Sequence, residues 1–379
     1  VEQGDSVEWR GDTEQTFDNA EQAYRKALAL APDNPRIEAQ LAAMLARRNV
    51  QFPASGRMEE IRRLTADAVR RDPEDPMPWV AQAKLLLLED KPKEAEEAAR
   101  KAIDRDPDFD RGYTQLGEAL IKQGRKDAGF AELRRAADMK QGYIRARLTL
   151  AAKLQNAGRY EEAATEFLKV LDYDRDHPTA KENLADIYFS TGRYSDAIPL
   201  LRDVFENTHD FRSANSLGNN YFQLGRIEEA IEAYKNAYAI NPFPVVARNL
   251  GEAYEKVGRK EEARRWYEHA IPGFDRQILL GGERAELLSG RAYCVAKLGR
   301  YDEALQNIEE AMRLKPNQNT FVFRVAQIYA MAGRREEVYA WTRRAVEAGY
   351  SREDVRRDTT FRDFQNDPRF QEILESNKH

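Results

Sequence analysis

A short pattern recurs about every 34 residues along the chain, and this period constrains the fold more than any single motif. A glycine marks the same point of most repeats. The marker glycines are Gly124, Gly158, Gly192, Gly225, Gly258, Gly299 and Gly333, with Gly56 and Asp90 in phase upstream. A fixed period of this size is typical of stacked small units that contact only their neighbours. The sequence therefore predicts a repeat array with one long surface, for which binding is the first functional hypothesis.

Each repeat predicts two antiparallel helices, as residues 144–177 illustrate. Apolar residues recur at helical spacing on both sides of Gly158, and the glycine itself allows the left-handed conformation that ends the first helix. A small residue stands five positions after the marker glycine in several repeats; these residues are Ala163, Ala197, Ala230, Ala263 and Ala304. We therefore expect the two helices of a pair to approach closely at that position.

Several further residues mark the same positions in successive repeats. They are the aromatic residues Trp79 and Tyr113, the pairs Leu116-Gly117, Leu217-Gly218 and Leu250-Gly251, the tyrosines Tyr188, Tyr221 and Tyr254, and the closing prolines Pro107, Pro242 and Pro316. In these features the chain resembles the tetratricopeptide repeat family. The resemblance implies an all-α fold, a right-handed α-solenoid of stacked antiparallel helix pairs.

The repeats predict four segments along the chain. An N-terminal segment at 1–16 precedes a half repeat at 17–34 that matches only a second helix, and the tandem array of about nine helix pairs covers 35–345. A capping segment at 346–379 follows, because the last repeat would otherwise expose its apolar face. Its predicted apolar set is Val355, Phe361, Phe364, Phe370, Ile373 and Leu374. Two longer spacings predict a loop around 48–55, and a lengthened, kinked second helix with a loop between Gly258 and Gly299.

Composition excludes several classes of partner and site. The 65 acidic and 60 basic residues leave a net charge of −5 without a long block of one sign, so we expect no nucleic-acid partner. No apolar run, the four leucines at residues 85–88 included, is long enough to insert in a membrane. Cys294 is the single cysteine, which excludes an internal disulfide and a thiolate metal site. We expect a soluble bacterial protein, in the cytoplasm, the periplasm or outside the cell. Val1 is not methionine, so a processed N-terminus and the edge of a larger protein both stay open.

Signatures of enzymatic chemistry are scarce in the sequence. It contains no phosphate-binding loop, dinucleotide fingerprint or nucleophile elbow, and its four histidines fall in separate repeats. Two stretches of alternating aspartates, at 104–110 and 172–176, lack the glycine and glutamate that a calcium loop needs. We therefore expect no enzyme activity, no metal and no cofactor.

The family resemblance implies that first helices line a concave groove. Residues six, nine and ten places before the marker glycine are expected to point into it. The candidate partner-binding residues at these places are Thr114, Glu118, Asn183, Asp186, Asn215, Asn219, Arg248, Asn249 and Glu252. Asparagine amides both donate and accept, so they can hold the backbone of an extended peptide. Asn219 and Asn249 match the asparagines of the family's carboxylate clamp, but its basic positions are filled by Asn215, Glu286 and Gly290, so we do not expect a chaperone C-terminus.

The leading hypothesis is a non-enzymatic scaffold that binds a partner protein or extended peptide in the concave groove. The chain's ending is similar to that of repeat modules in bacterial signalling proteins. A first alternative is therefore a regulatory or sensor module of a larger bacterial kinase, cyclase or transcription regulator. A second alternative, ranked last, is a carbohydrate-binding or enzymatic solenoid that uses the acidic residues Asp186 and Glu252.

Overall fold

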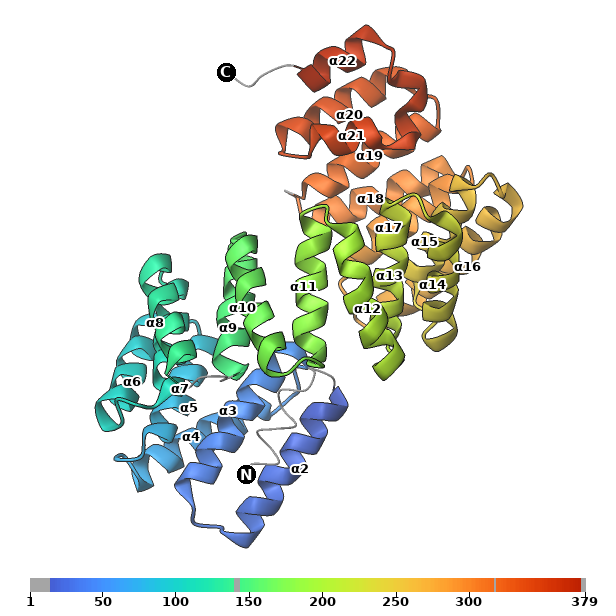
Figure 1. Ribbon diagram of the computed structural model, residues 1–379. Helices are drawn as coiled ribbons and strands as arrows, with labels where there is room; N and C mark the ends of the chain where they lie inside the picture. The colour runs from blue at the N-terminus through green and yellow to red at the C-terminus, as the bar shows by residue number, and fades with distance from the viewer. Residues whose placement is uncertain (1–13, 140–143, 317, 376–379) are drawn as a thin grey trace. The chain divides into compact units, whose positions relative to one another are not determined.

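A computed structural model describes residues 14–139, 144–316 and 318–375. Within those ranges every regular element is helical (Figure 1). The chain divides into two compact units, an N-terminal unit ending at Leu200 and a C-terminal unit beginning at Leu201. Each unit is a stack of antiparallel helix pairs, which is the predicted all-α solenoid.

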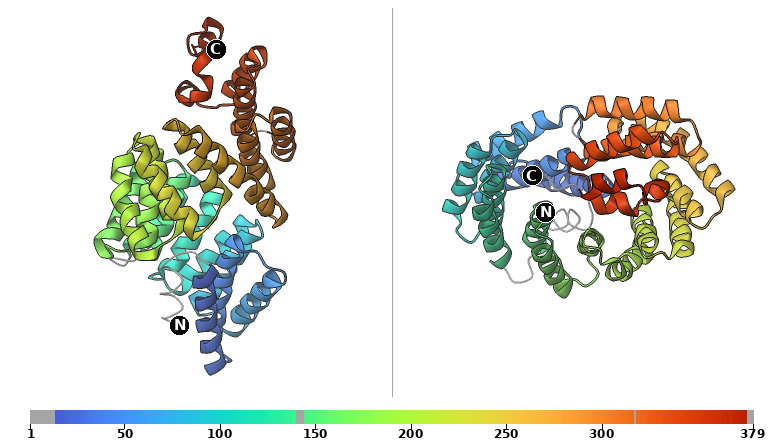
Figure 2. Two further views of the ribbon diagram at one scale, coloured as in Figure 1. Left: turned by 90° about the vertical axis from the view of Figure 1, so that its right-hand side faces the viewer. Right: turned by 90° about the horizontal axis from the view of Figure 1, so that it is seen from above.

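From Glu14 on, the N-terminal unit consists of a single helix followed by helix pairs. Its helices are α2 (Glu14–Leu30), α3 (Pro35–Gln51), α4 (Arg57–Arg71), α5 (Pro76–Leu88), α6 (Pro92–Arg105), α7 (Asp110–Lys122), α8 (Lys126–Asp138), α9 (Ile144–Asn156), α10 (Tyr160–Tyr173) and α11 (Pro178–Ser190). The first helices α3, α5, α7 and α9 each contact the next one in this series, so they form a continuous wall. Figure 2 shows the successive pairs side by side. The division between the units falls within α12 (Tyr194–Thr208).

The C-terminal unit repeats the same arrangement. Its helices are α13 (Phe211–Gln223), α14 (Ile227–Ile240), α15 (Pro244–Lys256), α16 (Lys260–Leu279), α17 (Arg284–Lys297), α18 (Tyr301–Leu314), α19 (Asn319–Met331) and α20 (Arg335–Glu347). Three short elements end it: α21 (Arg352–Arg357), the 3-10 helix η1 (Thr359–Phe364) and α22 (Pro368–Glu375). The helix α16 has 20 residues against 14 in α14, and it continues through Pro272 instead of ending there.

Glycine has two distinct roles in these pairs. At the turn, Gly158 adopts a φ of +74°, which ends α9 and lets α10 fold back. Inside helices, glycine permits close approach: a Cβ on Gly218 would lie 2.4 Å from two ring carbons of Tyr234 on α14. The leucine-glycine pairs of the sequence therefore make room for the aromatic residue of the second helix. The five predicted small alanines are likewise buried, all with at most 3% of their surface exposed.

Both ends of the described array are covered by apolar and ionic contacts. At the start, Arg48 of α3 donates to Asp18 at 2.5 Å and to Glu21 at 2.6 Å, which fastens α2 to the first pair. At the end, the short elements bury one cluster against α19 and α20. Its tail members are Val355, Phe361, Phe364, Phe370, Ile373 and Leu374. These contacts cover the apolar face that the last pair would otherwise expose.

Candidate functional site: an inner groove of the N-terminal unit

The N-terminal unit contains a cavity of about 710 Å³, which we call the inner groove. Its walls come mainly from the first helices α3, α5, α7 and α9, and Thr179 and Asn183 of α11 extend it. First helices face the hollow because the second helix of each pair packs on their other side. Residues at the same position of successive repeats therefore lie next to one another on the same wall.

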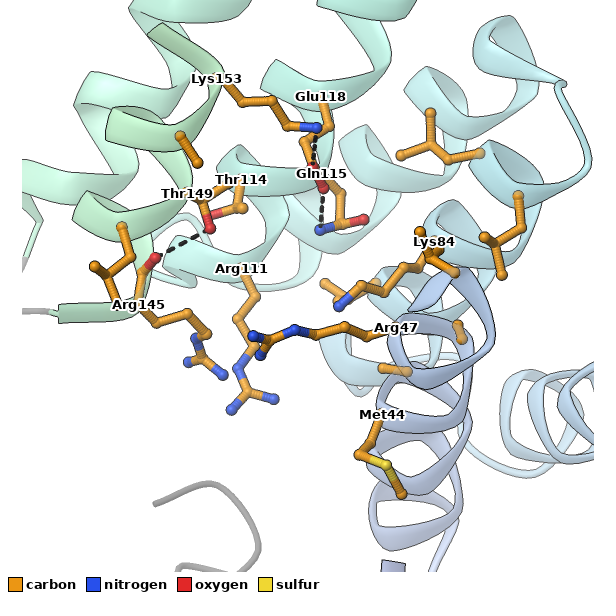
Figure 3. A pocket seen from close by; sticks show the side chains of 18 of the residues that line it. Met44, Arg47, Lys84, Arg111, Thr114, Gln115, Glu118, Arg145, Thr149 and Lys153 are labelled. Atoms are coloured by element: carbon orange, nitrogen blue, oxygen red, sulfur yellow. Dashed lines mark hydrogen bonds and ion pairs between the residues drawn. The ribbon is translucent and has the colours of Figure 1, made fainter. Parts of the chain in front are cut away.

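Basic side chains dominate the charged part of the inner groove. In Figure 3 Arg47, Lys84, Arg111 and Arg145 gather from four successive first helices. Lys122 and Lys153 also line the cavity, and Glu118 is the one acidic residue among the described lining residues. Arg111 and Arg145 share a repeat position, thirteen residues before Gly124 and Gly158, which places them on adjacent helices of one wall.

The single carboxylate of the groove is matched by protein groups. Lys153 Nζ lies 2.8 Å from Glu118 Oε1, and Gln115 Nε2 donates to Glu118 Oε2 at 3.2 Å (Figure 3). Burial alone would raise the pKa of Glu118, but the charge of Lys153 and these hydrogen bonds outweigh it and lower that pKa. In return the charge of Glu118 raises the pKa of Lys153. Glu118 therefore stays ionised and paired with Lys153.

An apolar stripe accompanies the basic side chains. It consists of Met44, Val50, Met77, Val80, Leu87, Leu88 and Leu148. Val50 is 65% exposed, so part of this stripe meets solvent. A surface that combines apolar and cationic groups can bury the apolar side chains of a ligand while it pairs with charges of the opposite sign.

The structure brings three of the sequence-predicted residues into the inner groove. Thr114, Glu118 and Asn183 line it, whereas Asp186 of α11 is exposed and outside its lining. Thr114 and Asn183 each bond a backbone carbonyl four residues back, at 3.1 and 2.8 Å. The prediction for this wall therefore emphasised amides and hydroxyls and missed its cations.

A signal for those cations was present in the sequence. The rule of six and nine places before the marker, applied to the first two repeats, selects Lys84 before Asp90 and Arg47 before Gly56. The arginines Arg111 and Arg145 lie at position thirteen, which the rule does not include. Their recurrence at one position in adjacent repeats is the sequence feature that indicates two neighbouring cations on the same wall.

The other five predicted residues belong to the C-terminal unit and form a cluster. Asn249 donates to Asn215 Oδ1 at 3.1 Å and to Asn219 Oδ1 at 3.3 Å, and Tyr234 donates to the same oxygen of Asn219 at 2.8 Å. Arg248 donates to Asn249 Oδ1 at 3.0 Å. The asparagines thus form hydrogen bonds with one another across repeats. These bonds occupy amide donors and acceptors that could otherwise bind a peptide backbone.

The side chains around this cluster are also paired or buried. Arg248 forms an ion pair with Glu252 at 3.4 Å, and Asn249 is only 7% exposed. Burial lowers the pKa of Arg324 on α19, and the nearby charge of Arg248 adds to that effect. The C-terminal unit therefore contains a compact polar network, whereas the inner groove lies in the N-terminal unit.

Within the described ranges, no group of three or more histidine, cysteine or acidic residues is placed to hold a metal ion. None of the helices in the part of the chain that the structure describes is long and apolar enough to span a bilayer.

A stack of antiparallel helix pairs with a groove along its first helices defines the class of α-solenoid repeat proteins. Tetratricopeptide repeat models match residues 80–144 and 148–207, residues 218–258, residues 246–273, and residues 12–34 and 285–318. The chain therefore belongs to the tetratricopeptide repeat family. Repeats of this family mediate protein–protein interaction, and scaffolds built from them are typically non-enzymatic.

Several solved structures are similar to parts of the chain, while no curated protein matches it. MamA from Desulfovibrio magneticus RS-1 is 21% identical, with a TM-score of 0.42 over 44% of this chain and 96% of MamA. PilF from Pseudomonas aeruginosa is 22% identical, with a TM-score of 0.42 over 60% of this chain and 96% of PilF. The APC/C hetero-tetramer Cut9–Hcn1 is 15% identical, with a TM-score of 0.48 over 95% of this chain and 73% of that one. At these values the likeness concerns the helical repeat alone.

Proposed function

We propose that this chain is a non-enzymatic scaffold that binds an extended segment of a partner protein in the inner groove. The observation that carries the proposal is the 710 Å³ hollow, lined by side chains from successive first helices. These helices are packed pair against pair, so the groove exists before a partner arrives. A preformed wall loses little conformational entropy on binding, which leaves more of the contact energy for affinity.

The polar network of the C-terminal unit is a second contact surface in this proposal. Asn249 is buried within it, so the contact would fall to the half-buried Asn215, Asn219 and Arg248. The alternative of a regulatory module in a larger signalling protein stays a prediction. The enzymatic alternative gains no support, because Glu252 pairs with Arg248 and Asp186 belongs to the other unit.

A matched pair of bulky substitutions tests the site. Thr149 of α9 lines the inner groove, whereas Thr165 of α10 is exposed in the same repeat. Each hydroxyl bonds the carbonyl four residues before it, at 3.0 and 2.9 Å. The two positions are thus locally equivalent and differ in the surface they face.

Peptides would be selected on the full chain from a random dodecapeptide display library, and their affinities measured by fluorescence anisotropy. Thr149→Trp fills the groove and should weaken the selected peptides about tenfold or more, while Thr165→Trp should leave them unchanged. Circular dichroism would establish that both variants fold. Failure to enrich any peptide, or equal affinity for the parent and Thr149→Trp, would overturn the proposal.

A further inference from the structure

Apolar side chains in the wall of the inner groove meet solvent. Val50 near the end of α3 is 65% exposed, and Leu87 and Leu88 at the end of α5 are half-buried. All three belong to the apolar stripe of the lining. Burying such surface against another apolar group is favourable, and exposed apolar patches mark places where a further segment docks. The occupant must carry apolar side chains and must be able to reach this wall.

The described part of the chain begins beside the same wall. In the first turn of α2, Arg47 Cζ lies over the Phe17 ring, 5.8 Å from its centroid. The carboxylate of Glu14, which begins α2, lies 4.0 Å from the guanidinium of Arg48. Arg47 lines the inner groove together with Val50, one turn further along α3. Residues 1–13, which we call the leading segment, are therefore joined to the chain at the rim of the groove.

The leading segment has the apolar residues that this wall requires. Val7 and Trp9 stand two residues apart, so an extended chain projects both to the same side. Gly4 and Gly11 make a helix unfavourable over these residues. An aromatic side chain of this kind buries about 150–250 Å² when it is enclosed. Trp9 is therefore the main apolar group that the segment can place against the stripe.

The leading segment is also long enough to reach the whole groove. An extended chain advances ~3.3 Å per residue, so residues 1–13 span up to about 40 Å. The wall of α3, α5, α7 and α9 contains three steps between neighbouring helices of about 8–10 Å each, or about 24–30 Å in all. The attachment at Glu14 therefore leaves no part of the stripe beyond reach.

We infer that the leading segment docks in the inner groove of its own chain, with Trp9 against the apolar stripe, and that a partner segment must displace it. The inference rests on the proposed function, since it describes the regulation of the same groove. A short tether gives an effective concentration in the millimolar range, which favours the chain's own segment over that of a second copy. The apparent affinity for a partner then falls with the fraction of chains whose groove is open.

Photo-crosslinking locates the segment without any peptide ligand. Trp9 of the full chain would be replaced by p-benzoylphenylalanine, and crosslinks would be mapped by mass spectrometry. We expect crosslinks within one chain to the apolar stripe, lost in Thr149→Trp and kept in Thr165→Trp. The control places the same group at Leu30, which is 82% exposed at the opposite end of α2 and should not reach the stripe. Crosslinks that fall outside the lining, or that join two copies only, would overturn the docking.

Peptide affinity tests the competition. Trp9→Ser in the full chain should bind the library-selected peptides about tenfold tighter than the parent, which is the ratio for a groove occupied about nine-tenths of the time. Leu30→Ser is the matched control, because it also removes an exposed apolar side chain but lies away from the groove. Equal affinity of Trp9→Ser and the parent would contradict the competition, as would an equal gain in Leu30→Ser.

The outcomes separate this inference from the proposed function. If selected peptides bind in a Thr149→Trp-sensitive way but position 9 does not crosslink to the lining, the inference fails alone. If position 9 crosslinks to the lining but no library peptide enriches, the proposed function fails and the docking stands. If neither result is obtained, both proposals fail.

Discussion

Replacing Gly218 by alanine tests how closely the helices of a pair approach. The new Cβ would lie 2.4 Å from Cδ1 and Cε1 of Tyr234 and 2.9 Å from its Cζ. Carbon atoms normally rest about 3.5–4.0 Å apart, so α13 and α14 would have to separate by roughly 1 Å. Tyr234 is only 3% exposed, so its ring is enclosed by neighbouring atoms of the core.

Two effects of opposite sign set the magnitude. Alanine in a helix interior is about 1 kcal/mol more favourable than glycine, which stabilises the variant. Overpacking a well-filled core costs about 1–3 kcal/mol, and a ring contact this short belongs at the upper end. We therefore expect Gly218→Ala to lower the free energy of unfolding by about 2 kcal/mol. For a unit of this size that corresponds to a drop of roughly 4–8 °C in Tm.

Thermal melts followed by circular dichroism at 222 nm would measure the drop, and a double-mutant cycle would assign it. In a Tyr234→Ala background the obstructing ring is gone, so Gly218→Ala should be neutral or stabilising by up to about 1 kcal/mol. The difference between the two backgrounds is the coupling of the two side chains. If Gly218→Ala raised Tm with Tyr234 in place, the close-approach explanation of the leucine-glycine pairs would be wrong.

Three other predictions concern the ends and the core of the array. Arg48→Ala should cost about 2 kcal/mol, because it removes two charge-assisted hydrogen bonds to α2, and hydrogen exchange should show α2 losing protection first. Hydrogen bonds from Tyr339 and Arg335 lower the pKa of Asp367 to about 2. The ionised carboxylate therefore stabilises the fold above its ordinary pKa near 4, and this stabilisation is lost as the pH falls toward 2. Asp367→Asn should make Tm depend less on pH between these two values. Cys294 is buried, which raises the pKa of its thiol to about 12 and shields the thiol from solvent. Iodoacetamide should therefore label Cys294 only as urea unfolds the chain. Rapid labelling of the native chain would contradict this burial.

The helix pairs could be predicted from sequence because their determinants are local. Gly158 sets the turn of one pair and Ala163 its close contact, and both act within a single repeat of about 34 residues. The apolar spacing around them defines which face each helix buries. The leucine-glycine pairs were visible as well, although the aromatic ring that requires each glycine became evident only when Tyr234 was placed against Gly218.

The candidate site depended on contacts between repeats. The rule of six, nine and ten places before the marker glycine predicts Thr114, Glu118 and Asn183 as groove residues, and they line the inner groove. The rule does not predict which side chains they contact. Nothing in a single repeat indicates that Lys153 of one helix binds Glu118 of its neighbour, or that Asn249 turns its amide toward Asn215. Such pairs join residues that lie 30 or more positions apart, and side-chain direction decides them.

The sequence by itself therefore determined the repeat, the paired helices and the family, since these follow from spacing within one unit. Only the tertiary structure decided which side chains meet along the first helices. It brought Arg47, Lys84, Arg111 and Arg145 into one lining although they occupy three different repeat positions. It also placed an apolar stripe in the same lining. The physical reason is that the groove forms only when repeats stack. Each repeat contributes a few of its side chains, so the composition of the groove cannot be read from a single repeat.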